Sequence, residues 1–205
     1  MPAIRLHSFL VVAGMALCCA GTLAVSSRAA ATELPRGAVL TEVRTAFANG
    51  DRIGSLHEGA DCRANSDREW SPLVQRRIQT EVSHVFRDEL AKAQPVGAAT
   101  KGAPLKVQAF LNDIHVDLCQ AAAGAWQGGF YVQVGWQIVS PQTGKVVYQA
   151  STDGSFTLAS PQRITSASAL REALGVAVRN LLGDRRFAAM LEQNGDRRLA
   201  LATPL

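Results

Sequence analysis

The sequence predicts an α+β domain: an antiparallel sheet of about four strands with two amphipathic helices packed on one face. Three observations support this class. Apolar residues recur every three or four positions over 72–90, which is the period of a helix with one buried stripe. Apolar and polar residues alternate over 130–139, which is the period of a strand. Turn residues at 140–144 then join this strand to a second alternating segment, as in a hairpin.

The expected order of elements is strand, helix, three strands, helix and short helix. The strands are expected at 52–58, 105–119, 130–139 and 146–150, and the helices at 72–90, 166–182 and 185–191. Phe156 and Leu158 extend the last strand or begin another short one. Turn residues dominate 59–67, so this stretch is expected to be a loop.

Capping residues support the three helix starts. Ser71 is a good N-cap, and Pro72 suits the first helical position. Thr165 or Ser166 can cap the second helix, and Asp184 the third. On the first helix, Arg77 and Glu81 are four residues apart, and this spacing predicts an ion pair within the helix.

The segment 105–119 changes the phase of its alternation. Apolar residues occupy odd positions up to Leu111 and even positions from Ile114 onward. A change of parity within one strand requires one extra residue. We therefore expect a β-bulge near Asn112 and Asp113.

The chain is expected to begin with a cleavable signal peptide at 1–31. Arg5 precedes an apolar run at 9–20, and Ala29 and Ala31 fit the small-residue rule for cleavage before Thr32. Residues 32–50 are a linker or a docking segment, whose apolar spacing would suit one helix. A single α+β domain is then expected at 51–193 and a frayed tail at 194–205.

Export places the mature chain in a bacterial-type periplasm or outside the cell. The apolar run is shorter than the ~20 residues that span a bilayer, and no later segment is long enough, so no stable membrane span is expected after cleavage. Cys18 and Cys19 lack the small preceding residue that a lipobox requires. Removal of 1–31 leaves 19 basic and 17 acidic residues, a net charge of +2, which does not favour a nucleic-acid partner.

Two cysteines remain in the mature chain, Cys62 and Cys119. An even number of cysteines in an oxidising compartment predicts a disulfide. This bridge would close a loop worth about 4 kcal/mol in the chain-entropy model. Zinc held by the two cysteines with His57 and His115 is the alternative. It is disfavoured because ligands four residues apart along a strand lie ~13 Å apart, so neither a metal nor another cofactor is predicted.

Three sets of residues are candidates for a ligand or partner surface. Asp113, His115 and Asp117 alternate and therefore share one strand face, as an acid–base cluster or as the solvent side of a half-covered sheet. Trp126 lies in a Gly-rich loop and either contacts a ligand or caps the edge of the core. Arg185 and Arg186 form part of a basic stretch that suits an anionic polymer or a solvated helix end.

The strand leading into a capped helix at 52–90, the Gly-Lys-Val-Val-Tyr segment at 144–148 and the closing helix after Pro161 resemble a known group of domains. This group is the small α+β domain of bacterial envelope proteins, such as the N-terminal domain of TolB and the YajG-type and CsgG-type lipoproteins. The resemblance covers 52–182 and departs from the lipoproteins in lacking a lipobox. It implies an envelope protein partner and brings no catalytic residues.

These observations favour a non-catalytic periplasmic module that binds a protein partner in the cell envelope. There is no Gly-x-Ser-x-Gly elbow and no phosphate-binding loop, although the sequence does not exclude an enzyme. One alternative is a small periplasmic hydrolase that uses the Asp113, His115 and Asp117 face, which would then line a pocket. Another is a binder of an anionic envelope polymer through Arg185 and Arg186. The oligomeric state is not predicted.

Overall fold

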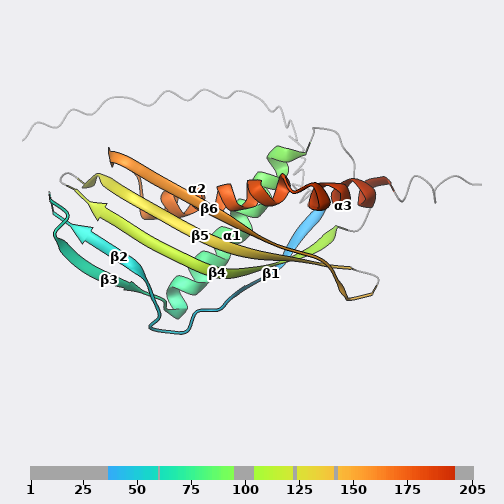
Figure 1. Cartoon of the computed structure of the whole chain (residues 1–205), viewed down its shortest axis with the longest axis horizontal. Helices are drawn as coiled ribbons and strands as arrows, with labels where there is room; N and C mark the ends of the chain where they lie inside the picture. The colour runs from blue at the N-terminus through green and yellow to red at the C-terminus, as the bar shows by residue number, and fades with distance from the viewer. Residues whose placement is uncertain (1–36, 60, 95–103, 122–123, 141–142, 197–205) are drawn as a thin grey trace, which may run out of the picture. The chain divides into compact units, whose positions relative to one another are not determined.

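The computed structural model describes residues 37–59, 61–94, 104–121, 124–140 and 143–196. They form six strands and three helices, drawn in Figure 1. The strands are β1 (Ala38–Thr45), β2 (Arg52–Glu58), β3 (Ala64–Glu69), β4 (Leu105–Gln120), β5 (Trp126–Val139) and β6 (Val146–Gln162). The helices are α1 (Pro72–Ala93), α2 (Ser166–Leu182) and α3 (Arg185–Asp196). The predicted signal peptide at 1–31 lies outside the described residues.

The six strands form one mixed sheet in the order β3-β2-β4-β5-β6, with β1 also paired to β4. The pairs β2–β3, β4–β5 and β5–β6 are antiparallel, whereas β1 and β2 both run parallel to β4. The α+β class is therefore confirmed. The prediction of an antiparallel sheet of about four strands is wrong, because β1 and β3 were missed and two of the pairings are parallel.

Strand β4 has two partners along the same edge. Its first half, 105–111, pairs with β1, and its last part, 116–120, pairs with β2. The β4–β5 register shifts between Leu111 and Asp113, which confirms the predicted bulge. Residues 46–51 leave the sheet between the two parallel partners, and Phe47 packs there against Trp70 with ring centroids 4.9 Å apart.

Strand β1 corrects the expectation of a docking helix within 32–50. Its register against β4 shifts between Leu40 and Glu42, so Thr41 is an extra residue in the strand. The bulge breaks the alternation of apolar residues and leaves a spacing that imitates a helix. Strand β3 was missed for a different reason: all six of its residues are exposed, so no apolar pattern distinguishes it from a loop.

The helices begin where their capping residues predict. Ser71 Oγ accepts from the N–H of Val74, Thr165 Oγ1 accepts from Ser168, and Asp184 Oδ1 accepts from both Arg186 and Phe187. Helix α3 extends to Asp196, beyond the expected start of the tail, and 197–205 lie outside the described residues.

The predicted Arg77–Glu81 ion pair is replaced by pairing between helices. Arg171 of α2 donates two hydrogen bonds to Glu81 of α1, at 2.5 and 3.1 Å. About two turns further along α1, Glu89 makes a second pair between the helices: Arg179 Nη1 of α2 lies 3.2 Å from Glu89 Oε1. These two carboxylates are the buried charged residues of the described chain. Each pairs with an arginine of α2, and Glu89 also accepts from Lys92 of its own helix at 2.8 Å.

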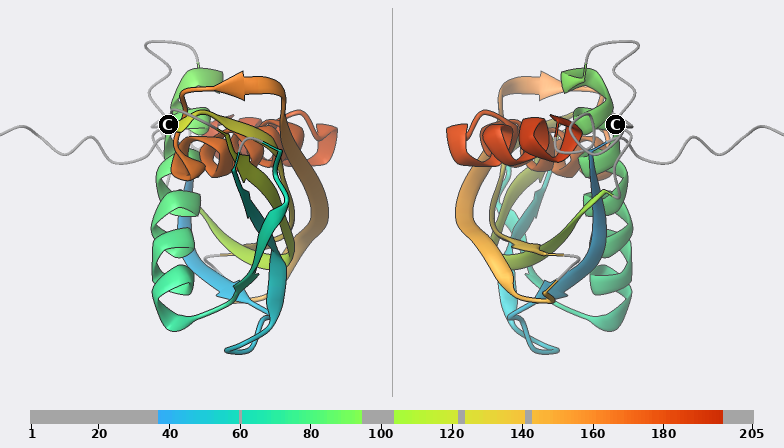
Figure 2. Two further views of the ribbon diagram at one scale, coloured as in Figure 1. Left: turned by 90° about the vertical axis from the view of Figure 1, so that its left-hand side faces the viewer. Right: turned by 90° about the vertical axis from the view of Figure 1, so that its right-hand side faces the viewer.

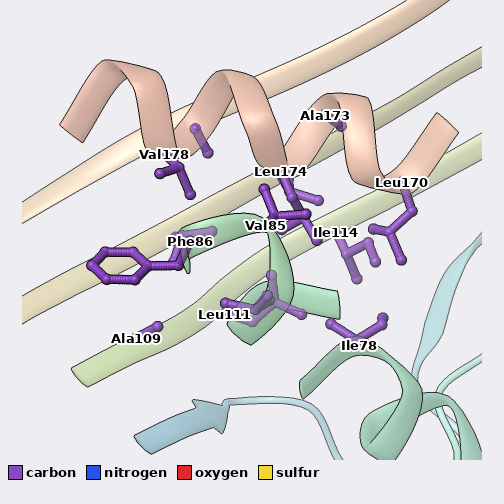
Figure 3. Close-up of a cluster of buried hydrophobic side chains, with 14 of the residues drawn as sticks. Ile78, Val85, Phe86, Ala109, Leu111, Ile114, Leu170, Ala173, Leu174 and Val178 are labelled. Carbon is purple, nitrogen blue, oxygen red and sulfur yellow. The ribbon is translucent and has the colours of Figure 1, made fainter. Parts of the chain in front are cut away.

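Helices α1 and α2 pack on the same face of the sheet, which confirms that part of the prediction (Figure 2). The core lies between this face, here called the inner face, and the helices. Figure 3 shows Leu111 and Ile114 of β4 in the same cluster of side chains as Phe86 of α1 and Leu174 of α2. Because Leu111 and Ile114 have opposite parity, the bulge between them is what keeps both side chains on the inner face.

Two glycines allow the strands beside β4 to approach it closely. A Cβ on Gly54 of β2 would lie 1.9 Å from the carbonyl oxygen of Val116, and one on Gly128 of β5 would lie 2.1 Å from that of Asp117. Both glycines have positive φ, +135° and +105°, and both adjoin a shift in register. Only glycine fits these positions, which flank the last third of β4 on its two sides.

Candidate functional site

The side of the sheet opposite the helices is the candidate site, here called the open face. It consists of side chains from β4, β5 and β6 with their neighbours on β1 and β2, and no described helix covers it (Figure 2). The alternation of each strand sends apolar residues inward and polar residues to this face. Its members are Glu42, Arg44, His57, Gln108, Phe110, Asn112, Asp113, His115, Asp117, Tyr131, Gln133, Gln137, Gln149, Ser151, Asp153 and Ser155.

Asp113, His115 and Asp117 lie on the open face, and all three are exposed. Their cross-strand neighbours on β5 are Gln133 for Asp113 and Tyr131 for His115. The hydrolase hypothesis requires the three side chains to line a pocket. Their exposure on the face of a sheet does not meet this requirement.

Tyr131, Gln133 and Asp153 form a hydrogen-bonded cluster at the centre of the open face. Tyr131 Oη and Gln133 Nε2 both donate to Asp153 Oδ1, at 3.0 and 3.1 Å. Partial burial, and then the hydrogen bond to Asp153, raise the pKa of Tyr131. The phenol therefore stays protonated and remains a donor to the carboxylate at neutral pH.

A second cluster joins β1 to β4 on the same face. Gln108 Nε2 donates to Glu42 Oε2 at 3.1 Å, and Arg44 Nε donates to Glu42 Oε1 at 2.6 Å. The Arg44 guanidinium also lies over the Phe110 ring, 5.8 Å from its centroid. The charge of Arg44 is therefore paired with that of Glu42, and its guanidinium is close to an aromatic ring.

The predicted disulfide between Cys62 and Cys119 is present, with Cα atoms 5.6 Å apart. It ties the loop before β3 to the end of β4. The zinc alternative is wrong, because both sulfur atoms are in the bridge and His57 Nε2 instead contacts Asp117 Oδ1 at 3.1 Å. Among the residues that the structure describes, no group of three or more His, Cys, Asp or Glu could hold a metal ion.

The other predicted site residues lie apart from the centre of the open face. Trp126, at the start of β5, is half-buried and packs against the hydrophobic core. Arg185 and Arg186 are exposed at the start of α3, on the helix side of the sheet. Their roles in binding stay predictions.

Sequence reasoning found the β4 part of the open face and missed the β5 and β6 parts. Tyr131 and Gln133 alternate with the apolar residues that were used to predict β5, so the same alternation places them on one face with Asp113 and His115. Asp153 could be added only with the β5–β6 register, which pairs it with Gln133. His57 could be placed on the open face only once the parallel pairing of β2 with β4 was known.

No protein-family model matches the sequence, and no curated protein is significantly similar to it. A search of solved structures finds similarity to the following three, among others. A candidate lipoprotein from Caulobacter crescentus CB15 is 16% identical over 74% of this chain and 89% of its own, with a TM-score of 0.33. A DUF330 protein from Xanthomonas campestris is 12% identical over 82% and 91%, with a TM-score of 0.33. The PelC dodecamer from Paraburkholderia phytofirmans is 14% identical over 68% and 89%, with a TM-score of 0.30.

These similarities are too low to support a functional assignment. The resemblance to the TolB, YajG and CsgG domains is not shown by them and stays a prediction. Within the described residues, the helices are all too short or too polar to span a membrane.

Proposed function

We propose that this protein is an exported, non-catalytic binding module of the cell envelope, and that its open face binds a protein partner with a basic surface. The observation that carries the proposal is the open face itself: a broad sheet surface free of described helices, with its polar side chains held in place by hydrogen bonds to one another.

The charges on the open face favour a basic partner. Asp113 of β4 and Asp153 of β6 lie on either side of Gln133 in one cross-strand row, and Asp117 lies four residues further along β4. Arg44, an arginine of this face, already pairs with Glu42, and Asp153 accepts hydrogen bonds from the uncharged side chains of Tyr131 and Gln133. The centre of the face therefore carries excess negative charge, and charge complementarity steers a basic surface towards it.

The Tyr131–Gln133–Asp153 cluster lowers the cost of binding. Its side chains are already held in one arrangement by hydrogen bonds at 3.0 and 3.1 Å. Ordering side chains at an interface costs about 0.5–1.5 kcal/mol for each flexible one, and this cost is reduced when the free protein already holds them.

A charge-neutralised variant tests the proposal. Asp113→Asn, Asp117→Asn and Asp153→Asn together should prevent recovery of the partner when the mature protein is cross-linked in the periplasm and purified. The wild-type interaction should also weaken as salt is added. The matched control is Arg185→Ala with Arg186→Ala, which alters the helix side and should recover the partner as the wild type does.

Two results would count against the proposal. One is a protein that cross-links to nothing but itself. The other is a partner that binds the open-face variant and the wild type equally well. Export is tested separately by the intact mass of the periplasmic protein, which should correspond to a chain beginning at Thr32.

Binding of an anionic envelope polymer is a second candidate function. It is favoured by the exposure of Arg185 and Arg186 at the start of α3, where the neighbouring acid, Asp184, accepts the capping hydrogen bonds. Salt-sensitive binding to an anionic polysaccharide that is lost in the Arg185→Ala, Arg186→Ala variant would support it, whereas binding that the double variant retains would remove it.

A further inference from the structure

The side of the sheet that carries the open face changes character at one end. Lys106 lies two residues before Gln108 of the open face and therefore points to the same side of β4. Figure 1 shows this end, where β4 begins and the β5–β6 hairpin turns. Residues paired across strands share one side of a sheet. The last row on this side, here called the end row, consists of Val39, Lys106, Val139 and Val146, paired in this order across β1, β4, β5 and β6.

The valines at this end expose apolar surface to water. Val146 is 49% exposed, and Val147, the extra residue of the bulge in β6, is 52% exposed. They are two of the three large apolar residues of the described chain that are exposed to this degree. Val39 and Val139 are half-buried, and neither belongs to the hydrophobic core or to the residues packed against it. Exposed apolar surface gathered in one place is typical of an interaction site.

Two exposed lysines accompany the valines. Lys106 belongs to the end row, and Lys145 directly precedes Val146. Within the described part of the chain, neither lysine forms an ion pair. The carboxylate of the next row, Glu42, already pairs with Arg44. This end of the sheet therefore carries positive charge that no described carboxylate compensates.

The acidic centre of the open face is too distant to cancel this charge. Lys106 and Asp113 are seven residues apart on β4, which is about 20 Å at the rise of a strand. Interactions between exposed charges are largely screened beyond about 8 Å at physiological ionic strength. The acidic centre and the end row with its lysines and valines are therefore separate surfaces.

The polypeptide also enters the domain at this end. The carbonyl oxygen of Gly37 accepts a hydrogen bond from the N–H of Leu105 at 2.9 Å, and β1 starts at the next residue. The predicted cleavage site precedes Thr32, and residues 32–37 can span at most about 20 Å. A chain still joined to its predicted signal peptide would therefore hold this end of the sheet close to the membrane.

We propose that this end of the sheet docks on an anionic lipid surface, with the valines at the headgroup boundary and Lys106 and Lys145 against the lipid phosphates. A lipid surface matches both components, because apolar side chains gain from burial at that boundary and lysines gain from the negative surface potential. An anionic polysaccharide matches the lysines alone. This docking is additional to the binding of a partner by the open face and shares only the predicted export with it.

Co-sedimentation of the mature, oxidised protein with vesicles tests the role of charge. Vesicles of phosphatidylethanolamine and phosphatidylglycerol in equal parts should bind the wild type about tenfold or more tightly than vesicles of phosphatidylethanolamine and phosphatidylcholine. Lys106→Gln with Lys145→Gln should weaken binding to the anionic vesicles about tenfold or more, since each lysine near such a surface contributes about fivefold.

The matched control for the lysine variant is Arg68→Gln with Arg163→Gln. It removes the same amount of charge from two exposed residues at the opposite end of the sheet, beside the last parts of β4 and β6. This control should bind the anionic vesicles as the wild type does. Urea denaturation should give all these variants nearly the stability of the wild type, because the substituted side chains are exposed.

Replacement of the valines distinguishes a lipid surface from another polyanion. Val146→Thr with Val147→Thr keeps the β-branched shape of both side chains and removes apolar surface. It should weaken binding to the anionic vesicles about threefold or more, because less apolar surface is buried at the headgroup boundary. Leu73→Gln alters the third exposed apolar residue, which lies at the start of α1, and should leave vesicle binding unchanged.

Four results would overturn the proposal. They are a wild type that does not bind the anionic vesicles, a lysine variant that binds as the wild type does, an equal loss in the arginine control, and lysine-dependent binding that the threonine variant retains in full. The last result would indicate an anionic polysaccharide in place of lipid. The variant with Asp113→Asn, Asp117→Asn and Asp153→Asn should bind vesicles at least as well as the wild type, so either proposal can fail without the other.

Discussion

Neighbouring residues of β5 lie in two very different environments. Trp136 on the inner face is 1% exposed, packs against Phe86 and donates from Nε1 to Thr152. Gln137, the next residue, lies on the open face and is half-exposed. One strand thus contributes to the core with one side, and no described helix covers its other side. The two faces can therefore be changed independently, and the predictions below test this separation from the largest expected effect to the smallest.

Substitution of adjacent residues on β5 should separate the faces most clearly. Trp136→Ala should lower the free energy of unfolding by about 3–5 kcal/mol, because it leaves a cavity beside Phe86. Gln137→Ala should change it by less than about 0.5 kcal/mol, because it removes no buried contact. Urea denaturation of the oxidised proteins measures both values. Equal losses in the two variants would show that the open face also supports the fold.

Removal of the disulfide should have the next largest effect. Cys62→Ala with Cys119→Ala should cost about 2–4 kcal/mol, because the bridge closes a loop with a sequence separation of 57. Thermal or urea unfolding measures the loss. Titration of the unfolded, oxidised mature protein should find no free thiol, and two reactive thiols per chain would contradict the bridge.

The ion pairs between the helices should make stability depend on pH. Hydrogen bonds from Arg171 lower the pKa of Glu81, and those from Lys92 and Arg179 outweigh burial to lower that of Glu89. A lowered carboxyl pKa contributes stability that is present above the unfolded pKa and lost as pH falls through the folded one. Unfolding free energy should therefore decline as the pH falls below about 4.5, the ordinary value.

Glu81→Gln with Glu89→Gln should flatten this acid dependence. The variant should also lose about 1–2 kcal/mol at neutral pH, a modest amount because Arg171 is 57% exposed. Urea titrations at several pH values provide the test. A variant with the wild-type acid dependence would show that other carboxylates are responsible.

The smallest effect on stability is expected at the centre of the open face. Asp153→Asn should change the unfolding free energy by less than about 0.5 kcal/mol, because the side chain is exposed. It should nevertheless lower the pKa of Tyr131, whose rise depends on burial first and on Asp153 second. Ultraviolet absorbance titration detects this change, and Tyr131→Phe identifies its signal. The pKa of Tyr148, which burial raises to about 12, should be the same in the variant and the wild type.

Local signals in the sequence were sufficient for the elements that depend on local interactions. Ser71, Thr165 and Asp184 begin the helices as expected, because a cap is made within three residues. The bulge in β4 was also predictable, since a buried strand must keep its apolar side chains on one face.

Interactions between distant segments could not be predicted in the same way. Nothing local indicates that β1 and β2 lie parallel to β4, because parallel pairing leaves no turn to recognise. Glu81 was assigned to Arg77 on its own helix, whereas its main partner, Arg171, is 90 residues away in the sequence. The open face was likewise only partly found, because Asp153 and His57 reach it through pairings between strands.

The division of β4 between two parallel partners has a consequence for the order of folding. A ribosome makes β1 and β2 first, but their parallel partner, β4, is absent until residues 105–120 have been made. The antiparallel pairs β4–β5 and β5–β6 close short loops, whereas the parallel pairs close loops of more than fifty residues and are expected to form later. The first strands of this domain to be synthesised are therefore expected to be the last to complete their pairing, and the Cys62–Cys119 bond holds β2 and β3 to the end of β4 once they have done so.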